Sequence, residues 1–122
     1  MKGFFITLIL FSILVAGGIL NFFFIHGICD EMNQMISEIS DTPSKENEEK
    51  IKKVHEHWEK AEKKVSISVS YIAIDEIGKL IDAIDVYNRL SDKEQLSYYI
   101  ALLKNAVENV RRLEQFSVKS IL

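Results

Sequence analysis

The residues with the most chemical potential lie in one short stretch, His55-Glu56-His57-Trp58-Glu59, which holds two of the three histidines and the only tryptophan. Zinc proteases place two histidines four residues apart, so that both side chains lie on one face of a helix. Here the histidines are two residues apart, which is about 200° around a helix, so they point to opposite sides. His55 and Glu59 share a face but supply only two ligands. We therefore predict that Trp58 is a packing residue and that the stretch is not a metal site.

A thiol and an imidazole also lie three residues apart, as Cys29 and His26. A catalytic thiol needs a base, an orienting group and a cleft, and a single helix beside an apolar segment supplies none of these. A lipidated cysteine would need small residues before it, and Ile28 does not fit. One cysteine cannot form an internal disulfide. We expect an unpaired thiol at the membrane interface, with an intermolecular disulfide as the alternative.

Acidic side chains are frequent in the second half of the chain, but they do not converge on a predicted pocket. Carboxylates that act as a general acid and a general base must face each other with pKa values driven apart, and neighbouring helix positions do not. The only Gly-Gly pair, Gly17-Gly18, lies in an apolar segment, which excludes a phosphate loop. We expect no enzyme activity, no cofactor and no catalytic or metal-binding residue. The acids considered are Asp75, Glu76, Asp82 and Asp85.

The elements that position these residues begin with an apolar N-terminus. Of the 122 residues 48% are hydrophobic, yet no charged side chain occurs from Gly3 to Ile25. A helix of this length is roughly 35 Å long, enough to cross a hydrocarbon core of about 30 Å. A cleaved signal peptide is the alternative, with Val15-Ala16-Gly17 as a cut, but the apolar run continues beyond it. We expect residues 1–27 to be a membrane anchor that contacts the lipid bilayer through residues 3–25.

Charge gives the expected orientation. Lys2 is the only basic residue before Lys45, and positive charge prefers the cytoplasmic side, so we expect a cytoplasmic N-terminus and residues 30–122 outside the cytoplasm, in the cell membrane as a single-pass protein. All 18 acidic residues and all but one of the 15 basic residues follow residue 29, a formal charge of −4. This balance argues against nucleic acid, and against anionic lipid as a generic partner.

Residues 28–122 are predicted to form an extracytoplasmic helical domain, because apolar residues recur there at spacings of three and four. The first helix continues from the anchor until Asp41–Ser44, where Thr42 is expected to cap a second helix with Pro43 at its first position. Residues 66–73 lose the apolar phase, and a bend or a helix buried on more than one side is expected there. The predicted apolar positions are Ile28, Met32, Met35, Ile36 and Ile39; Ile51, Val54, Trp58, Ala61 and Val65; Ile74, Ile77, Leu80, Ile81 and Ile84; and Leu96, Tyr99, Ile100, Leu103, Val107, Val110 and Leu113.

Local signals refine this outline. Ser91 with Glu94 is predicted to form a capping box at the start of the last helix. Gly78 is either a weak point or a place of close helix approach. Tyr98 and Tyr99 must point in different directions, and one of them is expected at the surface. Five Glu→Lys pairs four residues apart are expected to support an exposed helix face: Glu46–Lys50, Glu48–Lys52, Glu49–Lys53, Glu56–Lys60 and Glu59–Lys63.

The predicted fold is all-α: an N-terminal transmembrane helix followed by a small antiparallel bundle of about three or four helices. The segments "HWEKAEKKVS", "IDEIGKL", "ALLKNAVENV" and the terminal "SIL" make the chain resemble the domain of unknown function 4363, a family found mainly in Gram-positive anaerobic bacteria. The resemblance implies an N-terminally anchored helical protein and no established enzyme activity. Where the family tends to carry an Asp-His pair and an acid, this chain has Ser70, Tyr71 and Ala73.

The function expected from these observations is a non-catalytic, single-pass membrane protein whose exterior bundle is a structural or interaction module. A protein partner or a homo-oligomer fits this role. The alternatives are a ligand-binding or sensory helical module, which a sizeable internal pocket would favour, and an accessory subunit of a membrane complex. The core residues expected to matter most are Trp58, Ile77, Ile81, Leu103 and Val107.

Overall fold

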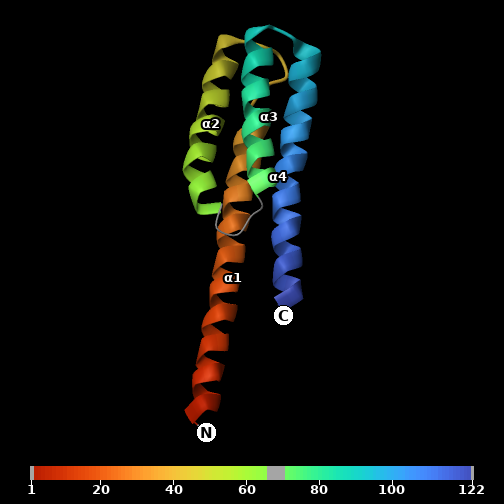
Figure 1. Ribbon diagram of the computed structural model, residues 1–122. Helices are drawn as coiled ribbons and strands as arrows, with labels where there is room; N and C mark the ends of the chain where they lie inside the picture. The colour runs from red at the N-terminus through yellow and green to blue at the C-terminus, as the bar shows by residue number, and fades with distance from the viewer. Residues whose placement is uncertain (1, 66–70, 122) are drawn as a thin grey trace.

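The computed structural model describes residues 2–65 and 71–121, with side chains up to Leu113. These residues form four helices, α1 (Lys2–Ser37), α2 (Lys45–Val65), α3 (Tyr71–Arg89) and α4 (Lys93–Ile121). Consecutive helices run up and down, and α4 returns to pack against α1 (Figure 1). In the described part of the chain, each helix contacts its two neighbours around the bundle. The prediction of an all-α antiparallel bundle is confirmed.

Helix α1 belongs to two environments. From Ile25 onward it is the first helix of the bundle, and Ile25, Cys29, Met32 and Ile36 are buried. Residues 2–24, called the projecting segment below, extend beyond the bundle (Figure 1). By length and composition α1 is the one helix in the described residues that could cross a membrane. The expected boundary at residue 27 therefore falls inside one continuous helix.

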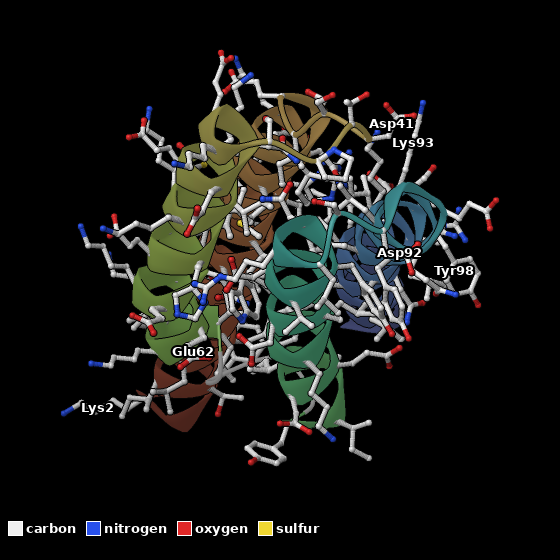
Figure 2. The ribbon with its side chains drawn as sticks, turned by 90° about the horizontal axis from the view of Figure 1, so that it is seen from above. Lys2, Asp41, Glu62, Asp92, Lys93 and Tyr98 are labelled. Carbon is white, nitrogen blue, oxygen red and sulfur yellow. The ribbon has the colours of Figure 1, made fainter. Side chains whose placement is uncertain are left out.

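The predicted apolar faces form the core. The described residues of α2, α3 and α4 that were predicted to be apolar are buried or packed against the core, apart from Leu113, which is 47% exposed where α4 runs past the end of α2. Tyr99 stacks on Tyr87 with ring centroids 5.2 Å apart, whereas Tyr98 is exposed and points outward (Figure 2). The predicted bend at residues 66–73 lies mostly outside the described residues.

Trp58 fills the part of the core nearest the projecting segment. Its side chain is 4% exposed, and it lies beside a gap of only about 10 Å³ between α1, α2, α3 and α4. A Cβ atom placed on Gly78 would lie 3.9 Å from Trp58 Nε1, so α3 approaches the indole closely at this glycine. The gap is too small for a ligand and barely matches one water molecule. The described core is therefore closed and apolar.

The predicted start of α2 is wrong. Ser44, and not Thr42, caps the helix, because its Oγ accepts a hydrogen bond from the Asn47 backbone N–H at 3.0 Å. Pro43 accordingly precedes the helix. Ser44 has the better geometry because its hydroxyl lies three residues before a free helical N–H, as an N-cap requires.

The predicted capping box of α4 is also wrong. The cap is Asp92, whose Oδ1 accepts from the Gln95 N–H at 3.1 Å. Ser91 instead ends α3 with a left-handed φ of 55°. Its N–H donates to the Asn88 carbonyl, and the Asp92 N–H donates to the Tyr87 carbonyl. This is a Schellman motif, in which the left-handed position is usually glycine.

The burial of Trp58 predicts that Trp58→Ala lowers the free energy of unfolding by about 3–5 kcal/mol, because the core loses its largest side chain and cannot close around the cavity. Guanidinium titration of the full-length protein in mild detergent, followed by circular dichroism, measures this change. Tyr71→Ala, which removes an exposed aromatic ring, is the matched control and should change stability by less than about 0.5 kcal/mol. An unfolding midpoint for Trp58→Ala equal to wild type would contradict the packing assignment.

The conformation of Ser91 predicts that Ser91→Gly stabilises the protein by about 0.5–1 kcal/mol. Glycine relieves the left-handed strain of about 1–2 kcal/mol, part of which is offset by its greater freedom when unfolded. Ser91→Ala retains the strain and should show no gain. The same unfolding titration compares the three proteins, and equal stability of the glycine and alanine variants would rule out this turn geometry.

Candidate functional site

The two histidines of the central stretch point to different neighbours. His55 Nε2 lies 2.8 Å from Glu59 Oε1, and His55 Nδ1 lies 3.9 Å from Asp82 Oδ1 on α3. His57 Nε2 lies 3.2 Å from Glu31 Oε2 on α1, close enough for an ion pair although its N–H is not aligned for a hydrogen bond. The predicted divergence of the histidines is confirmed, because His55 faces α3 and His57 faces α1. Trp58, the next residue along α2, is buried in the core.

Two acids of α3, Asp75 and Asp85, are paired with basic groups on the same helix. Arg89 lies 3.1 Å from Asp85 and 3.9 Å from Glu48 on α2, at the rim of a surface groove of about 350 Å³. Lys79 lies 3.0 Å from Asp75, whose carboxylate raises the pKa of this exposed lysine by hydrogen bonding and by its charge. These contacts hold the carboxylates along the helix surface. They do not set two carboxyl groups against each other as acid–base hydrolysis requires.

A polar cluster joins α1 to α4 beside the projecting segment. Arg111 forms an ion pair with Asp30 and lies 3.5 Å from Glu108. Glu108 in turn accepts a hydrogen bond from Asn33 Nδ2 at 2.9 Å. Because Arg111 and Glu108 lie about 80 residues from their partners on α1, no local sequence pattern predicts the cluster. The cluster fixes the register of α4 along α1.

Cys29 lies beneath this cluster and is 3% exposed. Its Sγ lies 3.7 Å from the Val107 carbonyl oxygen, within range of a weak S–H donor. Burial raises the pKa of the thiol to about 11, an effect that the positive charge of Arg111 partly offsets. The thiol forms no disulfide within the described residues, and it lies in the bundle core and not at the interface where it was expected. It is therefore held in its protonated, unreactive form.

The structure does not bring Cys29 together with His26. The His26 ring packs on Phe22, with ring centroids 4.2 Å apart. Its Nε2 is buried, and among the described residues it has no hydrogen-bond partner. A thiol–imidazole pair therefore does not form between these two residues.

Two asparagines form the polar interior at the opposite end of the bundle. Asn47 Nδ2 donates to Asn88 Oδ1 at 3.1 Å and to the Ser40 carbonyl at 2.9 Å. Asn88 Nδ2 donates to the Ser44 carbonyl at 3.1 Å. This asparagine pair ties the connection between α1 and α2 to the end of α3. Sequence reasoning missed it, although Asn47 and Asn88 continue the buried faces of Ile51 and Ile84 by one helical turn.

A further groove lies between α1 and α2, where the projecting segment leaves the bundle. It has a volume of about 420 Å³, and we call it the junction groove. Sequence reasoning did not anticipate it, because its walls come from two helices. Its lining includes Phe23, Phe24, Ile28, His57, Lys60 and Lys64.

Comparison with known proteins places these features in a family. The model of a protein family described as a domain of unknown function, DUF4363, matches residues 23–121. The chain belongs to the DUF4363 family. The predicted resemblance is thus confirmed, and the match includes α2, α3, α4 and the part of α1 that packs in the bundle. No curated protein and no solved structure matches the chain.

The DUF4363 region of this chain thus combines a closed core with polar contacts at both ends. Among its described residues, no group of three or more His, Cys, Asp or Glu side chains is arranged to hold a metal ion. Four of the ion pairs among its described residues join neighbouring helices: His55–Asp82, His57–Glu31, Arg89–Glu48 and Arg111–Asp30. The arrangement therefore serves to hold helices in register, and its open surfaces are the places where another molecule can bind.

The raised pKa of Cys29 predicts slow alkylation of the folded protein. The thiolate forms only as the pH rises toward about 11, so the rate with iodoacetamide should keep rising beyond pH 9, where an ordinary thiol levels off. At pH 8 the rate should be at least about 100-fold below that of the protein unfolded in guanidinium. Mass spectrometry of timed samples across pH 7–11 measures both rates. A folded-state rate that levels off near pH 9 would show that the thiol is exposed to water.

Proposed function

We propose that this protein is a non-catalytic, single-pass membrane protein whose helical bundle lies outside the cytoplasm and acts as an interaction or structural module. One observation carries the proposal: α1 is a bundle helix from Ile25 onward, while the same helix before Ile25 presents apolar side chains that the bundle does not cover. Soluble monomers rarely expose contiguous apolar patches larger than a few hundred Å². A bilayer would cover this surface.

The exposure pattern of the projecting segment supports a membrane environment. Its exposed large apolar side chains range from 38% exposed at Ile19 to 73% at Leu14, and only 6% of the most apolar window of α1 is buried in the protein. A core helix of a soluble protein would be mostly buried. The projecting segment is also roughly 35 Å long, which suits a hydrocarbon core of about 30 Å.

The end of the bundle beside the projecting segment suits a membrane surface. Tyr71 and Ile72 at the start of α3 are 78% and 76% exposed, and aromatic residues are enriched at membrane–water interfaces. Helix α4 runs past the end of α2 beside the projecting segment (Figure 1). From Arg111 to Ile121 its backbone extends about 15 Å, which would bring its end into the headgroup region.

The interior supports an interaction role over catalysis or storage of a ligand. The described core leaves a gap of about 10 Å³, and Asp75 and Asp85 of α3 are paired with basic groups at the surface. A partner protein, a second copy of the chain or a larger membrane complex would therefore contact an outer surface. Val86 and Leu90 are 49% and 68% exposed, one turn apart at the end of α3 away from the projecting segment, and offer a small apolar contact there.

One experiment with the variant Lys93→Cys tests both membrane insertion and orientation. Lys93 is exposed and points outward at the end of the bundle away from the projecting segment (Figure 2). We expect the full-length protein to stay in the membrane after alkaline carbonate, at its uncleaved mass. A membrane-impermeant maleimide should label Lys93→Cys in intact cells, while wild type, with only the buried Cys29, should stay unlabelled.

Three outcomes of that experiment would contradict the proposal. Release by carbonate would exclude the anchor, a shortened chain would indicate a cleaved signal peptide, and labelling only after lysis would reverse the orientation. The interaction role has its own test, lysine crosslinking in the membrane followed by identification of crosslinked chains. Recovery of the protein as an uncrosslinked monomer would contradict a partner or homo-oligomer.

A further inference from the structure

The junction groove combines an apolar wall with exposed positive charge. The wall on α1 is formed by Phe23, Phe24 and Ile28, and Ala61 contributes from α2. Phe23 and Phe24 are 65% and 43% exposed, although they lie beside the bundle. The groove is therefore an open apolar surface that continues from the projecting segment onto the bundle.

Two lysines line the α2 side of the groove. Lys60 and Lys64 are four residues apart, so they lie on one face of α2. The predicted Glu56–Lys60 pair does not form, and neither lysine has an ion-pair partner among the described residues. Lys64 Nζ lies 6.0 Å from the centroid of the Phe24 ring, at cation–π distance. The Lys64 ammonium group thus lies at the edge of the apolar wall, and Lys60 lines the groove one helical turn away.

The other titratable groups in the lining offset only part of this positive charge. Glu31 is the one acid of the lining, and it lies 3.2 Å from His57. With His57 neutral the lining carries a net charge of +1, in a protein whose formal net charge is −3. The groove therefore differs in sign from the chain as a whole.

We propose that the junction groove binds one anionic phospholipid. Its phosphate would lie between Lys60 and Lys64, and the part of an acyl chain nearest the headgroup would lie along Phe23 and Phe24. This inference rests on the proposed function, because it requires residues 3–25 to span the bilayer. The two lysines would then lie at the depth of the lipid headgroups. Phe24 is one residue before the end of the span, and Lys64 Nζ lies 6.0 Å from the centroid of its ring. Lysines at such a boundary place the stem on apolar surface and the ammonium among the headgroups.

A phospholipid fits this site better than a soluble anion or a peptide. Free phosphate would contact the two lysines but leave the aromatic wall exposed. An acidic peptide could satisfy the charge, yet the wall continues directly into the apolar surface of the projecting segment, where lipid chains are the neighbours. Only a molecule with an anionic head and an apolar chain matches both parts. Basic pockets between transmembrane helices on the cytoplasmic side bind anionic headgroups, and the same charge attraction would act in this groove.

The test uses the full-length protein in mild detergent and native mass spectrometry, with equimolar phosphatidylglycerol and phosphatidylcholine added as probes. We expect wild type to retain one phosphatidylglycerol in preference to phosphatidylcholine. Lys60→Gln with Lys64→Gln should lower that preference by roughly 10–30-fold, since each lysine near an anionic headgroup contributes a factor of about five. Lys52→Gln with Lys53→Gln makes the same charge change on the same helix away from the groove and should leave the preference unchanged.

A second variant tests the apolar wall independently of charge. A side chain at Gly27, which also lines the groove, would enter open space, because a Cβ atom there meets nothing within 4 Å. Gly27→Leu should fill part of the groove without disturbing the bundle. It is expected to reduce retention of both lipids while the helical signal and the unfolding midpoint are kept.

Several results would overturn the inference. Equal retention of the two lipids by wild type would remove the selectivity, and an equal loss in the Lys52/Lys53 control would reduce it to a general charge effect. Displacement of the lipid by 10 mM inorganic phosphate would identify a site for a free anion instead. A wild type that resists carbonate extraction but lacks lipid preference refutes this inference alone, whereas release from the membrane refutes the proposed function.

Discussion

The bundle depends on α1 keeping one helical register through the change of environment at Ile25. On the bundle side, Ile25, Cys29, Met32 and Ile36 recur at intervals of three and four and are buried against α2 and α4. The same interval extends backward to partly covered positions in the projecting segment, Val15, Gly18 and Phe22. Because α1 is one unbroken helix, the face that it packs against α2 and α4 also fixes the orientation of the bundle relative to the projecting segment.

Polar contacts at the two ends determine how the apolar helices pair. A core of Ile, Leu and Val can slide by a turn at modest cost, since its side chains are similar in shape. The asparagine pair at the far end and the Arg111 cluster beside the projecting segment remove this freedom, because any slide would leave buried or half-buried polar groups unpaired. Neither end offers a reactive site. Both are explained by the need to hold four helices in one register.

The sequence predicts the elements better than it predicts their ends or their contacts. Spacings of three and four identified the buried faces, including Trp58 and Ile77, because burial of an apolar face is the strongest constraint on a helix. The caps were predicted one or two residues early. Thr42 and Ser91 are both acceptable caps in isolation, and the choice of Ser44 and Asp92 follows from turn geometry that includes contacts with other helices. Side chains that meet across 40 to 80 residues, such as Asn47 with Asn88, have no local signal.

The charge pattern shows why composition alone does not reveal the positive charge of the junction groove. A formal charge of −3 describes an acidic protein, and the acids and bases of α2 were expected to pair along that helix. In the structure Glu46–Lys50 is the one of these five pairs that lies within 4.0 Å among the described residues, and Glu59 turns to His55 instead. Exposed pairs of this kind contribute little energy, so other nearby groups compete for the same side chains. Lys60 and Lys64 have no ion-pair partner among the described residues, and they carry their charge beside an apolar wall. The local charge at the base of the bundle is therefore opposite in sign to the average, and it is the local charge that a molecule entering the junction groove would meet.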